Sequence, residues 1–127
     1  MSETNIYVTF PQTVDGDSYT VLHKIFYWKS NIIPFADGKV RGTVENSFQL
    51  DEHLDILRIA TTLLTEDPDY SSVYCLDYFL NELGSVSNIA PGERIFSARF
   101  VVNRLYLVTF ERIDPFFVIG LDDPTKP

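Results

Sequence analysis

The sequence predicts an α+β fold, in which an antiparallel sheet of about five to six strands carries a central two-helix insertion packed on one face. Strand-like segments occupy both ends of the chain, where apolar and polar residues alternate. Between them, residues 51–83 carry apolar residues at helical spacing. Strands and helices that come in separate runs are typical of α+β domains.

Two segments near the N-terminus predict a β-hairpin. Residues 6–10 alternate, are rich in β-forming side chains and end at Pro11. A turn signal at 14–17 separates them from residues 19–28, where seven of ten side chains are β-branched or aromatic. A helix over 19–28 is an open alternative, because these apolar residues also fit helical spacing: Val21, Leu22, Ile25 and Phe26.

The next two segments predict a loop and a further strand. Residues 31–39 contain Pro34 and an Asp-Gly pair, which favour a loop. Residues 40–50 have a mixed pattern, and we expect a strand there that ends near Phe48.

Two amphipathic helices are predicted in the middle of the chain. The first spans 51–66, with apolar residues at Leu54, Ile56, Leu57, Ile59, Ala60, Leu63 and Leu64. Asp51 and Glu52 lie in its first turn, where the helix dipole favours negative charge. The Asp-Pro-Asp run at 67–69 ends it, and a second helix is expected over 70–83, capped by Gly84.

The last third of the chain returns to strands. Residues 96–102 and 106–110 alternate between apolar and polar side chains, so they predict a hairpin that turns at Asn103 and Arg104. A final strand is expected over 116–121, followed by a flexible polar tail at 122–127.

Length and composition bound the kind of protein. The 127 residues fit a single domain, and one cysteine cannot form an internal disulfide. We find no signal-peptide pattern and no apolar run long enough to span a membrane, so we expect a cytoplasmic location. A net charge of −8 disfavours direct binding to nucleic acid or to an anionic membrane.

The acidic excess is concentrated in the middle of the chain. Residues 45–93 hold ten acids and one base, Arg58, for a net charge of −9. The flanking segments 1–44 and 94–127 are close to neutral. Such a cluster either forms a well-solvated face or attracts a cationic partner.

On the predicted helices, polar and aromatic residues form a candidate binding surface. Asp55 and Arg58 are spaced to pair, which leaves the other acids of the first helix without a cationic partner there. Tyrosines at i, i+4 and i+8 of the second helix lie beside acids, and tyrosine is enriched at binding hot spots. The candidate partner-binding residues are Asp51, Glu52, Asp55, Glu66, Tyr70, Tyr74, Asp77, Tyr78, Asn81 and Glu82.

We expect no catalytic residue, no metal and no cofactor. His23 and His53 are far apart in the sequence, and Cys75 borders an apolar stripe, so neither a zinc site nor a Cys-His nucleophile is indicated. No glycine-rich phosphate loop or nucleophile elbow is present.

The leading hypothesis is a non-enzymatic acidic protein that neutralises a basic protein partner. This profile resembles that of bacterial toxin immunity proteins, a likeness of general character that rests on no motif. The resemblance implies an inhibitor of a nuclease-type toxin. Two alternatives remain open: a small-ligand or enzymatic domain with a cleft around His23 and an arginine such as Arg99, and a structural or assembly subunit.

Overall fold

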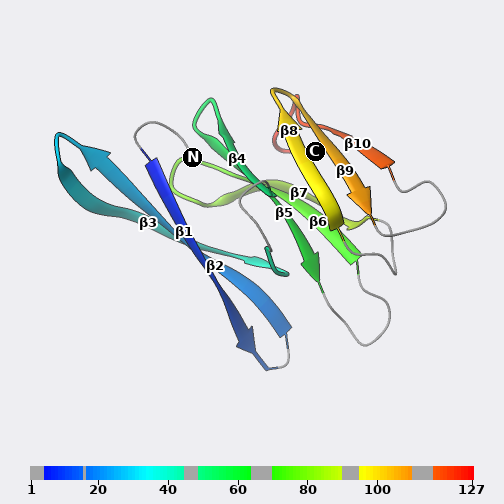
Figure 1. Cartoon of the computed structure of the whole chain (residues 1–127), viewed down its shortest axis with the longest axis horizontal. Helices are drawn as coiled ribbons and strands as arrows, with labels where there is room; N and C mark the ends of the chain where they lie inside the picture. The colour runs from blue at the N-terminus through cyan, green and yellow to red at the C-terminus, as the bar shows by residue number, and fades with distance from the viewer. Residues whose placement is uncertain (1–4, 16, 45–48, 64–69, 90–94, 110–115) are drawn as a thin grey trace.

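The chain folds into β-strands stacked in three antiparallel sheets (Figure 1). The computed structural model describes residues 5–15, 17–44, 49–63, 70–89, 95–109 and 116–127. Within these ranges the strands are β1 (Asn5–Val14), β2 (Asp17–Trp28), β3 (Asn31–Arg41), β4 (Leu50–His53), β5 (Ile56–Leu63), β6 (Tyr70–Leu76), β7 (Glu82–Ile89), β8 (Ile95–Val101), β9 (Arg104–Thr109) and β10 (Phe116–Gly120).

Each sheet is a simple meander of neighbouring strands. The N-terminal sheet has the order β1-β2-β3, the middle sheet β4-β5-β6-β7 and the C-terminal sheet β10-β9-β8. All pairings are antiparallel, as expected where short turns join consecutive strands. The middle sheet lies between the other two, so it is covered on both faces (Figure 1).

One hydrophobic core fills the space between the N-terminal and middle sheets. Its buried members come from β2, β3, β5, the end of β6 and the turn that follows: Leu22, Val40, Leu57, Ile59, Leu76 and Leu80. Tyr7 of β1 and Leu50 of β4 pack against this cluster. Leu22 lies on one face of β2, so every second residue of β2 faces this core and the residues between them face away from it.

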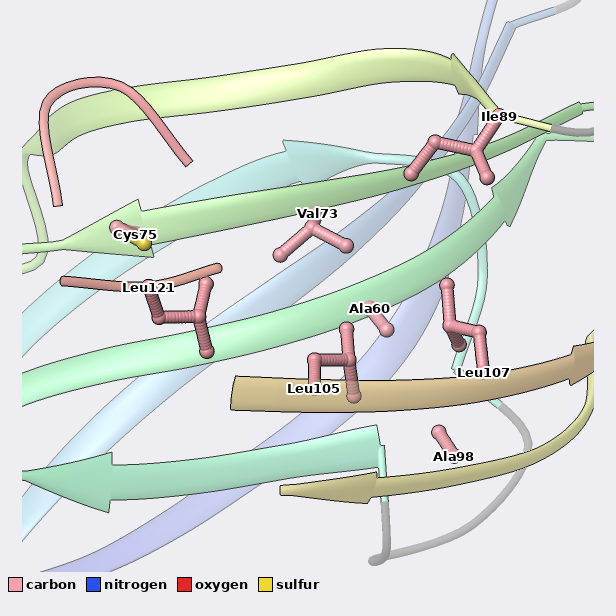
Figure 2. Close-up of a cluster of buried hydrophobic side chains, with 8 residues drawn as sticks. All are labelled: Ala60, Val73, Cys75, Ile89, Ala98, Leu105, Leu107 and Leu121. Atoms are coloured by element: carbon pink, nitrogen blue, oxygen red, sulfur yellow. The ribbon is translucent and has the colours of Figure 1, made fainter. Parts of the chain in front are cut away.

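A second core joins the middle and C-terminal sheets (Figure 2). Its buried members are Ala60, Val73, Cys75, Ile89, Ala98, Leu105, Leu107 and Leu121. Cys75 is fully buried there, and burial raises the pKa of its thiol. Burial of this apolar surface is the main force that holds the two sheets together.

The predicted α+β fold with a two-helix insertion is wrong, because the described residues of 51–63 and 70–83 form β4, β5, β6, the start of β7 and the turns β4–β5 and β6–β7. The reason is visible in β5. Leu57 and Ile59 face the N-terminal sheet, while Ile56 and Ala60 face the C-terminal sheet. A strand covered on both faces has apolar residues in an unbroken run, which imitates the periodicity of a helix.

The predicted loop over 31–39 is also wrong, since this segment belongs to β3. Pro34 is tolerated because β3 is an edge strand whose ladder is interrupted nearby, with a register shift opposite Lys24 and Ile25. The strand expected over 40–50 ends at Arg41, and its predicted end at Phe48 lies outside the described residues.

Other predicted elements are confirmed. Residues 19–28 lie in a strand rather than a helix and pair with β1 in a hairpin. The hairpin β8–β9 turns at Val102 and Asn103, one residue earlier than expected, and β10 is the predicted final strand.

In the tail, the Thr125 backbone lies against Gly84 of β7, and Lys126 N–H donates to the Asp123 carbonyl at 3.0 Å.

Candidate functional site

Two hairpin turns of the middle sheet lie together at one end of the stack. The turns β4–β5 and β6–β7 share an end because the middle sheet is an antiparallel meander. The β2–β3 half of the N-terminal sheet reaches the same end, since the Lys24 ammonium of β2 donates to the Tyr78 carbonyl at 2.9 Å. The turns β2–β3 and β4–β5 both point upward in Figure 1.

Lys24 is a buried cation at this end, only 1% exposed. Its Nζ lies 3.7 Å from the centroid of the Tyr78 ring and 5.2 Å from that of Phe35. Aromatic faces attract cations, so the two rings offset part of the cost of removing the charge from water. Burial still lowers the pKa of Lys24, against the opposing field of nearby acids.

A tyrosine–carboxylate pair lies beside Lys24. The Tyr7 hydroxyl of β1 donates to Glu52 of β4, and the Asn5 side-chain amide donates to the same carboxylate at 3.0 and 3.3 Å. Burial and the hydrogen bond to Glu52 raise the pKa of Tyr7. The carboxylate of Glu52 is therefore tied between the two sheets and is no free surface charge.

The turn after β6 presents two aromatic side chains on a fixed frame. One Asp77 carboxylate oxygen accepts the N–H groups of Phe79 and Asn81, both at 2.9 Å. The Asp77 backbone also stabilises this turn. Its N–H donates to the Asn81 carbonyl, and its carbonyl accepts from the Leu80 N–H. These bonds hold Tyr78 and Phe79 in position.

Phe35, Tyr78 and Phe79, together with the acids Asp55 and Asp77, form what we call the aromatic corner. The rings of Phe35 and Phe79 stack at 5.6 Å, and Tyr78 meets both edge-on at 4.9 and 5.5 Å. Phe79 remains 61% exposed and Phe35 38% exposed. Stacked aromatic rings in contact with water are a typical feature of binding surfaces.

The structure brings only part of the predicted site together. Glu52, Asp55 and Asp77 are all close enough to raise the pKa of Lys24, and Tyr78 contacts it directly. Asn81 ends the turn that follows β6 and Glu82 begins β7, and both are exposed. The residues around Lys24 gather because the turns β4–β5 and β6–β7 lie together, and the described part of the middle sheet contains no helical stripe.

The other predicted residues lie elsewhere. Asp51 pairs with the buried Arg58, so the expected Asp55–Arg58 pair is replaced by this one. Tyr74 packs against the core between the N-terminal and middle sheets. Tyr70 begins β6, but its side chain and the whole of Glu66 lie outside the described residues.

Sequence reasoning missed Lys24, Tyr7, Phe35 and Phe79. A signal for Lys24 was present, because it occupies a core-facing position in the alternation of β2, next to Leu22 in that face. Phe35 was overlooked because residues 31–39 were predicted to form a loop, whereas they belong to β3. Phe79 lay within the second predicted helix, over 70–83, where the structure has strands and a turn.

The residues of the alternative cleft do not meet. His23 lies on the outer face of the N-terminal sheet, where it bonds Asp37 and stacks on Phe10 at 5.3 Å. Arg99 lies exposed on β8, at the far side of the stack. Across the described ranges, no three His, Cys, Asp or Glu side chains are grouped to hold a metal ion.

Comparison with known proteins assigns the chain to a family. A family model described as a beta propeller domain matches residues 1–127. An uncharacterized protein of Methanocaldococcus jannaschii, MJ1554, is 39% identical over 93 residues, which cover 71% of this chain and 15% of that protein. An uncharacterized protein of Archaeoglobus fulgidus is 36% identical over 118 residues, which cover 87% of this chain and 19% of that protein.

The chain thus spans less than a fifth of the length of these relatives. No solved structure matches it significantly. Archaeal relatives and an all-β propeller family overturn the resemblance to bacterial toxin immunity proteins. In the part of the chain that the structure describes, no helix has the length and apolarity that crossing a membrane requires.

Proposed function

This chain belongs to the beta propeller domain family, and on that premise we propose that it is a non-enzymatic binding module that holds a basic protein segment at the aromatic corner. A fold shared by many functions does not fix the partner, so the proposal rests on the chemistry of the corner. The observation that carries it is the exposed Phe35–Phe79 stack beside Lys24, on which the charges of Asp55 and Asp77 act.

The corner combines two features that attract a lysine or arginine side chain. The exposed face of Phe79 provides a cation–π surface. The acids around it supply a negative field, which speeds association and selects cationic partners. Because the Asp77 turn is already ordered by hydrogen bonds, little conformational entropy is lost on binding.

Binding of a synthetic lysine- and arginine-rich peptide tests this proposal. We expect binding that weakens with added salt, and no binding of a glutamate-rich peptide. Phe79→Ser removes about 1 kcal/mol of cation–π attraction and should weaken binding about fivefold. Asp77→Asn keeps the acceptor that holds the turn but removes its charge, so it should mainly slow association.

Val8→Ser is the matched control, because Val8 is an exposed apolar residue on the outer face of the N-terminal sheet. Binding to this variant should equal binding to the original chain. The proposal is wrong if the basic peptide does not bind, or if Phe79→Ser and Val8→Ser have the same effect.

A further inference from the structure

Leu54 lies at the tip of the turn β4–β5 in an unfavourable conformation. His53 and Ile56 pair directly, so Leu54 and Asp55 form a two-residue turn, with φ values of 51° and 64°. Such turns favour asparagine and glycine, because larger side chains crowd the backbone at positive φ. Leu54 is also 81% exposed, so its apolar side chain lies mostly in water. Backbone strain and apolar exposure at one residue point to a functional position.

The turn that holds Leu54 lies beside the aromatic corner. β5 and β6 are paired as far as Leu57 and Leu76, so the turn before β5 emerges next to the turn that follows β6. Asp55, the neighbour of Leu54, is close enough to Lys24 to raise its pKa. Leu54 therefore adds an exposed apolar side chain to the acidic side of the corner.

Ile33 adds a further exposed apolar side chain, from β3. Ile33 pairs with Phe26, which by alternation lies on the same face of β2 as Lys24. Ile33 is 49% exposed, and it comes two residues before Phe35. Four exposed apolar side chains from three hairpins thus border the corner, and we call them the apolar rim: Ile33, Phe35, Leu54 and Phe79.

The backbone at the centre of the rim is fixed and has its own hydrogen-bond partners. Leu80 of the turn after β6 is buried against β3, because a Cβ added to Gly38 would lie 2.9 Å from the Leu80 Cβ. Within the same turn, hydrogen bonds already engage these N–H groups: Asp77, Phe79, Leu80 and Asn81. This turn therefore offers side chains to a partner and has no spare N–H groups at these positions.

We propose that the partner held at the aromatic corner is an amphipathic helix, whose apolar face packs on the rim and whose lysines or arginines meet Asp55 and Asp77. A helix satisfies its own backbone hydrogen bonds, so side-chain contacts are enough to bind it. The two acids select positive charges at the border of its apolar face. This inference rests on the proposed function and adds to it the form of the partner.

Binding of synthetic peptides of about 18 residues tests the inference. In the first peptide, leucines and lysines are spaced so that the leucines form one helical face. The second has the same composition in an order that spreads the leucines around the helix. We expect the first to bind about tenfold more tightly and to gain helical circular dichroism on binding.

The outcomes separate this inference from the proposed function. Equal binding of the two peptides, or binding of the first without a gain of helix, would overturn the inference and leave the basic partner in place. If neither these peptides nor the lysine- and arginine-rich peptide binds, the proposed function fails as well.

Leu54→Asn separates binding from folding. Asparagine suits a positive φ, so this variant should have a higher urea midpoint than the original chain, yet bind the first peptide about tenfold more weakly. Val102→Asn is the matched control. Val102 also lies in a turn, with a φ of 48° and 58% exposure, but it belongs to the C-terminal sheet. Its variant should keep full binding.

Equal binding by Leu54→Asn and Val102→Asn would remove Leu54 from the surface and overturn the inference. Vesicles of phosphatidylcholine provide the last comparison, because exposed apolar turns can also enter a lipid surface. We expect no binding to these vesicles. Vesicle binding that is lost in Leu54→Asn would assign the rim to a membrane and overturn the helical partner.

Discussion

At the scale of single residues, Lys24 is the most unusual feature of the molecule. A cation is buried between two sheets, held by one carbonyl and the faces of aromatic rings. Isolated buried charges are costly, and this cost appears as the lowered pKa of Lys24. Glu52, Asp55 and Asp77 oppose that shift, so these three acids also support the buried lysine.

Lys24→Met should change how stability depends on pH. Folding lowers the pKa of Lys24 below its ordinary value of 10.5. Between the lowered pKa and pH 10.5, Lys24 therefore binds fewer protons in the folded chain than in the unfolded chain. The free energy of unfolding of the original chain therefore rises with pH across that range, by about 1.4 kcal/mol for each pH unit. Urea denaturation should show this rise in the original chain and not in Lys24→Met.

The comparison is made below pH 10, because the raised pKa of Tyr7 lowers stability above that value in both proteins. Parallel stability curves for the two proteins would contradict the prediction.

At the scale of elements, the exposure of each sheet decided what the sequence could predict. The hairpin β8–β9 was predictable because the C-terminal sheet has one covered face, so its residues alternate. The strands β5 and β6 were not, because both of their faces are covered. The same error put Tyr74 on the predicted surface, whereas Tyr74 packs against a core, and a turn brings Asp77 and Tyr78 close to Lys24.

The turn β8–β9 carries backbone strain that a substitution can relieve. Val102 has a φ of 48°, which β-branched residues rarely adopt, and its side chain is 58% exposed. Val102→Asn should raise the free energy of unfolding by about 1 kcal/mol, because asparagine tolerates this conformation. The Arg58 side chain donates to the Val102 carbonyl, and that bond is retained.

Val101→Asn is the control for this prediction, because Val101 lies in the strand just before the turn. Thermal unfolding should show a gain for Val102→Asn and a small loss for Val101→Asn. A loss in both would mean that the turn is not strained.

At the scale of the whole molecule, the three sheets are offset. The N-terminal sheet covers β4 to β6, and the described core on the other side draws its middle-sheet members from β5, β6 and β7. The chain passes from the first sheet to the second at Gly42, whose N–H donates to the Ser18 carbonyl at 2.9 Å. This crossing fixes how the first two layers meet.

Gly42→Ala should therefore destabilise the stack strongly. Gly42 has a φ of 94°, and an added Cβ would lie 2.7 Å from the Thr61 hydroxyl of β5. Strain and crowding together should lower the free energy of unfolding by about 2–4 kcal/mol. Gly120→Ala is the control, because a Cβ there meets nothing within 4 Å. Equal urea midpoints for the two variants would exclude a close approach at Gly42.

The buried thiol of Cys75 allows a chemical reagent to report on the junction between the middle and C-terminal sheets. It is the sole cysteine of the chain, and its raised pKa keeps it in the unreactive protonated form. An alkylating reagent reaches it only while the two sheets are apart. The rate at which the reagent labels Cys75 in the unaltered chain therefore measures how often these two layers separate.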